Sequence, residues 1–196
     1  MSNPDRYWLE WPQGDGLLTA HEPTQDEVRA AAPLLAHWYN EPVNRALLTN
    51  NVDLQPAEVA ARFDELGAAG DRPLLLLVDG RLVGDCDLRH LETDRAEYAV
   101  LVGARELQAK GLGGRFTAMV LALAFGPLGL DRVYISVIPG NQGSLRMFTK
   151  LGFTVDDSVD ARRYAEVPEE ICLSLSAAAL RSARPELFTQ VRIRLR

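Results

Sequence analysis

Cysteine is scarce in this chain of 196 residues, which contains only Cys86 and Cys172. Two isolated thiols cannot form a disulfide framework, and none of the three histidines has ligand spacing with them, so we expect no metal site and a reducing, cytoplasmic compartment. The sequence also lacks a long apolar run and a signal peptide. These absences argue against a membrane-spanning protein and predict no membrane partner.

Basic charge is in deficit, because 21 Lys and Arg residues face 27 Asp and Glu residues and the net charge is −6. A broad nucleic-acid-binding face needs clustered Lys and Arg, so we expect no nucleic-acid partner. An anionic ligand would need a locally basic site or one built from backbone amides. The hydrophobic fraction of 47% is that of an ordinary globular protein, and no linker divides the chain, which predicts a single domain over residues 1–196.

Apolar periodicity predicts an α/β (α+β) fold in the first half of the chain. Thr24 followed by Glu27 indicates a helix N-cap, and Pro33 should kink or split that helix. Asp79-Gly80 is a strong hairpin signal. The expected elements are a strand at 17–20, helices at 24–40 and 56–66, and an antiparallel meander of three strands at 73–78, 81–88 and 96–102.

The second half predicts a mixed, mostly antiparallel sheet of six to seven strands flanked by helices. Asn141 should cap a helix that runs to Leu151 and ends at Gly152. The tail 176–196 is ambiguous between a short helix and an edge strand near 188–195. The other expected elements are a helix at 113–125 and strands at 132–138, 153–156 and 171–175.

The segment 108–115 joins a strand region to the start of the helix at 113–125. Its three glycines permit positive φ, and the free N–H groups and dipole of a helix start form an anion site, with Lys110 adding positive charge. A Walker A loop would need Lys then Ser or Thr after the last glycine, and the dinucleotide fingerprint would need glycine where Phe116 stands. An ordinary strand-to-helix turn is the alternative.

Two motifs in the expected order resemble the core of the GNAT superfamily of N-acetyltransferases: Gln108-x-x-Gly111-x-Gly113 and, about thirty residues later, Asn141 with Phe148 and Leu151-Gly152-Phe153. The resemblance covers about residues 74–153, and the stretch 38–44 is similar to the RimJ/RimL-like subfamily. It implies the GNAT fold, in which splayed central strands bind acyl-CoA.

The resemblance implies acetyl-CoA as the acyl donor. Its pyrophosphate would lie on the backbone amides of residues 109–114, and its pantetheine arm would add beside the strand at 96–102. Asn141 is also a plain helix cap, and the two roles are compatible. The implied cofactor-binding residues are Val100, Leu101, Val102, Gln108, Ala109, Lys110, Gly111, Leu112, Gly113, Gly114, Asn141 and Phe148.

Glu97 stands eleven residues before Gln108, the spacing at which the histone-acetyltransferase branch of the family has its catalytic glutamate. A base is needed because an alkylammonium must lose a proton before its nitrogen attacks the thioester. The alternative for Glu97 is a solvated edge-strand residue. Many family members protonate the CoA thiolate with a tyrosine where this chain has Phe148, so Ser144, Tyr164 or solvent would have to substitute.

On the acceptor side, Trp38 and Asp87 are the expected substrate-binding residues, with Asp85 and His90 as neighbours. The alternative for Trp38 is a core position, because an aromatic residue within a helical pattern is usually buried. The resemblance implies direct acetyl transfer to a primary amine of a protein N-terminus or a small molecule. A longer acyl group and an antibiotic amine are alternatives within the enzyme class. A CoA-binding regulatory module without catalysis is an alternative outside it, and a monomer and a homodimer are both compatible with the sequence.

Overall fold

The computed structural model describes residues 5–14, 16–48 and 52–196, and within them nine strands form one sheet in the order β7-β8-β6-β5-β4-β3-β2-β1-β9. Among these strands β5 and β6 run parallel, whereas the other neighbouring pairs are antiparallel. The strands are β1 (Tyr7–Gln13), β2 (Gly16–His21), β3 (Arg72–Val78), β4 (Arg81–Arg89), β5 (Arg95–Val102), β6 (Arg132–Val137), β7 (Thr154–Val155), β8 (Ile171–Ser176) and β9 (Arg192–Leu195).

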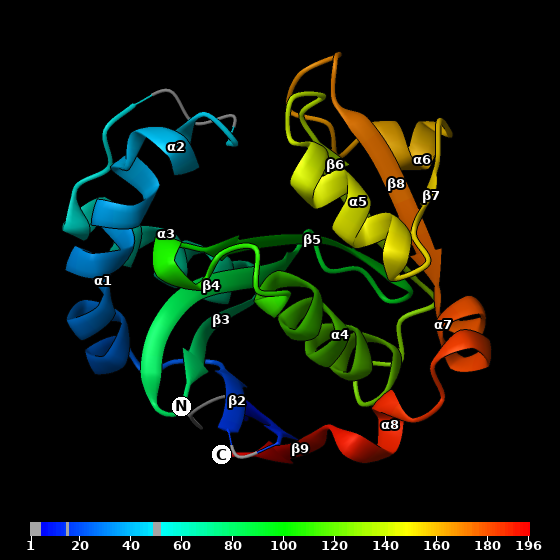
Figure 1. Cartoon of the computed structure of the whole chain (residues 1–196), viewed down its shortest axis with the longest axis horizontal. Coiled ribbons are helices and arrows are strands. Elements are labelled where there is room, and N and C mark those ends of the chain that lie inside the picture. Colours follow the sequence, from blue (N-terminus) through cyan, green and yellow to red (C-terminus); the bar gives the residue numbers. More distant parts are fainter. Residues whose placement is uncertain (1–4, 15, 49–51) are drawn as a thin grey trace.

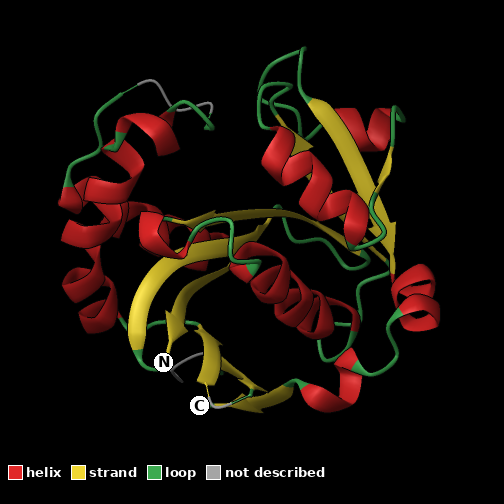
Figure 2. Cartoon of the chain, viewed as in Figure 1, coloured by secondary structure: helices red, strands yellow, loops and turns green. Residues whose placement is uncertain are grey.

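Helices flank both sides of this sheet (Figure 2). In Figure 1, α1 and α3 lie together at one side, and α4 crosses the front of the strands. The helices are α1 (Gln25–Asn40), α2 (Pro42–Arg45), α3 (Pro56–Ala69), α4 (Leu112–Phe125), α5 (Gln142–Lys150), α6 (Val159–Arg162), α7 (Ala177–Ala183) and α8 (Leu187–Gln190), with a 3-10 turn at Arg105–Leu107. The mixed α/β architecture expected from the sequence is confirmed.

Local signals explain how α1 forms. The Thr24 hydroxyl accepts the N–H of Glu27 at 3.2 Å, and the Glu27 carboxylate accepts the N–H of Thr24 at 2.7 Å, which confirms the capping box. The prediction that Pro33 splits the helix is wrong, since α1 continues unbroken to Asn40. Pro33 lies on the exposed side of α1, where its ring does not disturb the packed face.

The meander is close to the prediction. Asp79 and Gly80 both have positive φ, +50° and +77°, as a two-residue hairpin turn requires. Successive residues of β5 face opposite sides of the sheet. Tyr98 meets Phe148 of α5 edge to face, whereas Ala99 lines a cavity walled by α3. The two faces of β5 therefore serve different purposes, core packing on one and a cavity on the other.

The expected count of six or seven strands is too low. Strand β1 was not predicted, although Leu9 and Trp11 are buried at alternate positions between more exposed neighbours. The tail also differs, because residues 188–190 belong to α8 and only Arg192–Leu195 forms an edge strand, antiparallel to β1. Within the described residues no helix is both long and apolar enough to cross a membrane.

Candidate functional site

The centre of the sheet is open on one side of β5. Strand β5 pairs with β6 only over Arg95–Glu97 against Arg132–Tyr134, whereas on its other side it pairs with β4 along its length to Val102. Among the described strands, the segment 100–102 therefore has no partner on the β6 side. An extended ligand can add to such a free edge through backbone hydrogen bonds. The splay expected between these strands is confirmed.

The loop in front of α4 is held in a left-handed geometry. Ala109 has φ +58° and Gly111, the N-cap of α4, has φ +78° and supplies no side-chain cap to the helix start. The N–H groups of the first turn are thus left for another acceptor. A Cβ at Gly113 would lie 2.9 Å from the sulfur of Met147, so glycine there lets α5 approach α4 closely.

The side chain of Gln108 holds this loop in place through two hydrogen bonds. Its Nε2 donates to the carbonyl of Val102 and to Oδ1 of Asn44, both at 2.8 Å, so it ties the end of β5 to the segment after α1. Lys110 is exposed beside it. The side chain of Gln108 acts on the loop geometry, and the direct ligand contact implied for it stays a prediction.

On α5, Asn141 is confirmed as the cap, since its Oδ1 accepts the N–H of Ser144 at 3.1 Å. Its Nδ2 lies 3.5 Å from the carbonyl oxygen of Leu47, in the segment after α2. Phe148 is buried against Tyr98 and Phe153, and Ser144 is half-buried outside the lining of the cavity described next. Their predicted roles toward the cofactor and the thiolate stay predictions.

A cavity of about 460 Å³ lies beside the free segment of β5, between the sheet and α3. Its floor includes Asp85 and Asp87 of β4 and Ala99 and Leu101 of β5, and its walls come from α3 and from Tyr39. Its volume is within the range of small-molecule sites. The predicted residue Asp87 is part of it.

The predicted residue Trp38 does not line this cavity, and its role toward a substrate stays a prediction. Its ring is buried and packs on Gly103, where a Cβ would come within 2.4 Å of the indole. Because neighbouring residues of a helix point in different directions, the packing of Trp38 turns Tyr39 toward the cavity. Within the stretch 38–44, Tyr39 therefore lines the cavity, whereas Trp38 packs in the core.

Two carboxyl groups stand side by side on the cavity floor. Asp85 and Asp87 lie opposite Leu101 and Ala99 of β5, at alternate positions that share one face of the sheet. Oδ2 of Asp85 accepts the hydroxyl of Tyr39 at 2.7 Å. Within the described part of the chain, Oδ1 of Asp85 and Oδ1 of Asp87 have no hydrogen-bond partner.

Burial changes the protonation of both groups. Loss of hydration raises the pKa of Asp85 to about 7, against the hydrogen bond from Tyr39 and with the help of the charge on Asp87. Loss of hydration also raises the pKa of Asp87 to about 6, although the positive charge of Arg89, whose Nε lies 3.7 Å from Oδ1 of Asp87, opposes the shift. Perturbed acids in a cavity are typical of functional sites.

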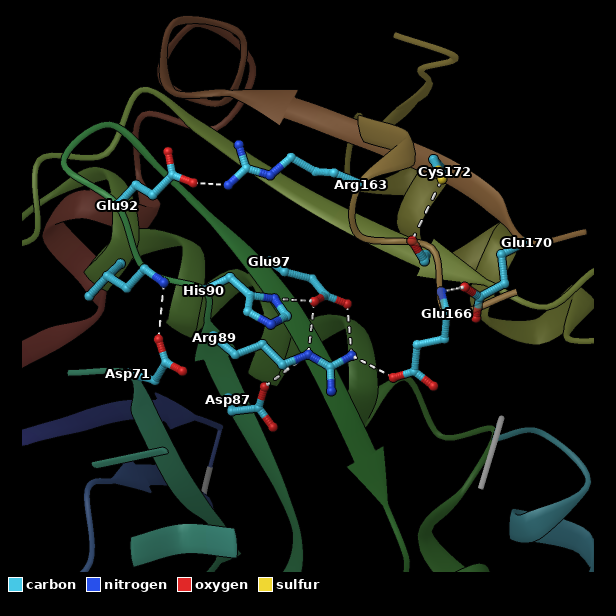
Figure 3. Close-up of polar contacts among 12 residues, drawn as sticks. Asp71, Asp87, Arg89, His90, Glu92, Glu97, Arg163, Glu166, Glu170 and Cys172 are labelled. Carbon is cyan, nitrogen blue, oxygen red and sulfur yellow. Dashed lines mark hydrogen bonds and ion pairs between the residues drawn. The ribbon is translucent and has the colours of Figure 1, made fainter. Parts of the chain in front are cut away.

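Glu97 has a different environment from the one expected of a solvated edge residue. It is 2% exposed, and Arg89 donates to both of its oxygens, from Nη2 to Oε1 at 2.7 Å and from Nε to Oε2 at 2.9 Å. Nδ1 of His90 lies 3.0 Å from Oε2, and Nη2 of Arg89 is 3.4 Å from Glu166 (Figure 3). Glu97 does not line the cavity. Its role as the base stays a prediction.

Arg89 and Tyr39 contact the two aspartates and were not singled out by sequence reasoning. Arg89 had a visible signal, because Asp85, Asp87 and Arg89 alternate along one strand and so must share a face. Tyr39 lies in the stretch 38–44 that carries the subfamily resemblance, but only the packing of Trp38 shows which side of α1 faces the cavity.

An opened pair of parallel strands, an uncapped helix start and an acidic cavity beside them define a class of transferase that binds an extended, phosphate-bearing cosubstrate. Comparison with known families agrees. The model described as "Acetyltransferase (GNAT) domain" matches residues 21–154, and the chain belongs to this family.

Individual relatives are more distant. Spermidine N(1)-acetyltransferase of Escherichia coli K12 is 25% identical over 129 residues, which are 64% of this chain and 63% of that protein. RimJ of Mycobacterium smegmatis, solved in complex with CoA-disulfide, has a TM-score of 0.69 at 18% identity, covering 96% of this chain and 97% of that one. Aminoglycoside acetyltransferase AAC(6')-Ib, solved with coenzyme A, has a TM-score of 0.69 at 17% identity, covering 85% and 99%. These structural likenesses show the fold alone.

Proposed function

We propose that this protein transfers an acetyl group from acetyl-CoA directly to a primary amine, of a small molecule or of a protein N-terminus. The observation that carries the proposal is the free edge of β5 at 100–102, which leads from the uncapped start of α4 to the acidic cavity. One cosubstrate laid along this edge has its phosphates at the helix and its thioester at the cavity.

Cofactor binding follows from the backbone. The pyrophosphate lies on the N–H groups of residues 109–114, where the helix dipole favours an anion. The pantetheine arm adds to Val100–Val102 as a strand would. The N–H groups of this strand polarise the thioester carbonyl as negative charge develops on its oxygen. That RimJ and AAC(6')-Ib were solved with CoA supports this assignment.

The charges that line the cavity favour a cationic acceptor. Acidic groups outnumber basic groups in the lining of the cavity. The acidic groups are Glu58, Asp85, Asp87 and Glu166, and the basic groups are Arg62 and Arg89. Excess negative charge attracts an ammonium group and repels acidic acceptors. The polyamine and aminoglycoside named for two relatives are acceptors of this kind and support the same substrate class here.

In the reaction, the deprotonated amine attacks the thioester carbon, a C–N bond forms, the C–S bond breaks and the thiolate of CoA leaves. The amine proton goes to a carboxylate, for which Glu97 and the pair Asp85 and Asp87 are the alternatives. Phe148 has no proton for the thiolate, so the sulfur takes one from Ser144, Tyr164, solvent or the product nitrogen.

The test combines calorimetry with an assay of thiol release. We expect coenzyme A to bind, and acetyl-CoA to release thiol with at least one of spermidine, kanamycin or a short peptide with a free α-amino group. A longer donor, hexanoyl-CoA, tests the acyl-chain alternative in the same assay. CoA binding without turnover of any amine would instead identify a regulatory CoA-binding module, and no binding at millimolar CoA would refute the proposal.

A further inference from the structure

We propose that Asp85 and Asp87 together bind the ammonium group of the acceptor and that Asp85 takes the proton which this group loses before attack. This inference rests on the acetyl transfer proposed above. It assigns the base to β4, whereas the family resemblance implies Glu97 on β5.

The first argument is the free bonding capacity of Asp85. Its side chain lines the cavity and is 5% exposed, and Oδ1 has no hydrogen-bond partner within residues 5–14, 16–48 and 52–196. A buried carboxylate oxygen without a partner costs free energy unless a ligand supplies one. An ammonium group has three N–H donors, so it can satisfy Oδ1 of Asp85 and Oδ1 of Asp87 at once.

The second argument is position. Asp85 and Asp87 face the cavity directly opposite Leu101 and Ala99, one strand away from the free edge of β5. Ala99, the neighbour of Asp87 on β5, also lines the cavity and has the smallest side chain of the three β5 residues that do so. An amine that lies over Ala99 thus has the carboxyl pair on one side and the thioester on the other.

The third argument concerns Glu97. Both of its oxygens already accept hydrogen bonds from Arg89, and it does not line the cavity. To act as the base it would have to release Arg89 and reach past it. We therefore assign Glu97 as a positioning residue, which holds Arg89 beside Asp87.

The proton balance is simple. The acceptor R–NH₃⁺ gives one proton to the Asp85 carboxylate and becomes R–NH₂, which attacks the thioester carbon. The second N–H proton leaves the nitrogen after attack and neutralises the thiolate of CoA, and Asp85 returns its proton to solvent. The products are the amide, CoA thiol and one free proton.

Charged and titratable groups from every surrounding element lie around this pair or line the same cavity. Asp87 disfavours a second negative charge at Asp85, and the guanidinium groups of α3 and β4 oppose that effect. The groups are Tyr39 of α1, Glu58 and Arg62 of α3, Asp71 before β3, Cys86 and Arg89 of β4, Glu97 and Tyr98 of β5, and Glu166 before β8.

The test is the pH dependence of kcat/KM between pH 5 and 8.5, measured with the best amine among spermidine, kanamycin and the peptide, and corrected for the charge state of that amine. We expect the wild type to show an inflection near pH 7. Asp85→Asn should lower kcat/KM by about 100-fold or more and abolish the inflection, with the Kd of CoA unchanged within twofold.

Three variants sharpen the assignment. Tyr39→Phe removes the hydrogen bond to the Asp85 carboxylate and should move the inflection to higher pH. This variant still tests the assignment if Asp85→Asn does not fold. Asp87→Asn removes a neighbouring negative charge and should move it to lower pH. Glu97→Gln should lower the rate but leave the inflection in place. Glu65→Gln, on the exposed face of α3, is the matched control and should change neither value.

The outcomes separate the two proposals. If Asp85→Asn stays within threefold of the wild type, or if only Glu97→Gln abolishes the inflection, the inference is wrong while the acetyl transfer stands. If the wild-type protein binds no CoA or acetylates none of the three amines, the proposed function fails and this inference fails with it.

Discussion

At the scale of single residues, the site depends on where small residues let larger ones approach. Gly103 has the face of Trp38 directly against its backbone, and Gly84 lies so close to β5 that a Cβ there would meet the carbonyl oxygen of Leu101 at 1.9 Å. At both positions glycine is required by a close contact and not by the backbone conformation, because neither residue has a positive φ. Such contacts leave no trace in periodicity, so the sequence offered a core position for Trp38 only as an alternative and could not show that it packs on Gly103.

Gly103→Ala should therefore destabilise the protein by about 1–3 kcal/mol, since the new methyl group has to displace the indole of Trp38. Urea unfolding monitored by tryptophan fluorescence measures this. Gly140→Ala is the matched control, because a Cβ there has no neighbour within 4 Å, and it should change stability by less than about 0.5 kcal/mol. Equal effects of the two substitutions would contradict the packing described for Trp38.

Asp85 also predicts how stability varies with pH. Its folded pKa of about 7 lies above the unfolded value of 3.8, so the folded state binds more protons between these values and loses stability as pH rises through that window. Asp85→Asn removes this loss. At pH 8 the variant should be more stable than the wild type by up to about 4 kcal/mol, and the difference should shrink toward pH 4.

Urea unfolding of both proteins at pH 4 and pH 8 checks this prediction. A stability difference that is the same at the two pH values would mean that the Asp85 carboxyl ionises normally in the folded protein.

At the scale of elements, the sequence predicted those with local signals. Thr24 and Glu27 indicate the start of α1, and Asp79-Gly80 indicates the turn between β3 and β4. Strand β1 and helix α8 were missed because tertiary partners decide them: β1 exists by pairing with β2 and β9, and α8 packs against α4. At the site, the glycine-rich loop had a local signal, the splay of β5 and β6 was implied by the family resemblance, and the cavity wall had neither.

The start of α4 supports a prediction about the cofactor. Lys110 is exposed beside an uncapped helix N-terminus, so Lys110→Ala should raise the Kd of CoA about 3- to 10-fold at low ionic strength, and by less in 0.5 M salt because salt screens exposed charges. Calorimetry at both salt concentrations measures this. Lys150→Ala removes the same charge at the far end of α5 and should leave the Kd unchanged; a similar loss in both variants would point to net charge instead of position.

At the scale of the whole molecule, the sheet consists of two parts joined by a short seam. Strands β9 and β1 to β5 form one part and β6, β8 and β7 the other, and three residue pairs of β5 and β6 connect them within the described sheet. In the binding mode proposed above, the cosubstrate enters this opening and contacts both parts. Its binding should therefore stabilise the fold against complete unfolding.

At 100 times its Kd, CoA should add about 2.7 kcal/mol, which corresponds to a rise in Tm of roughly 5 to 10 °C for a chain of this size. Thermal unfolding followed by circular dichroism, with and without CoA, tests this. Adenosine, which lacks the pyrophosphate and the pantetheine arm, is the control and should shift Tm by less than about 1 °C. No shift with saturating CoA would contradict binding to the native state.

The continuous pairing of β4 with β5 has a consequence for motion. The carboxyl pair sits on β4 and the free edge on β5, and these strands are hydrogen-bonded from Gly84–Val102 to Arg89–Glu97. The carboxyl pair and the free edge therefore belong to one continuously hydrogen-bonded unit, whereas only three residue pairs join this unit to β6 in the part of the sheet that the structure describes. A displacement of the β6 side would thus leave the spacing between the proposed proton acceptor on β4 and the proposed acyl-donor edge on β5 unchanged.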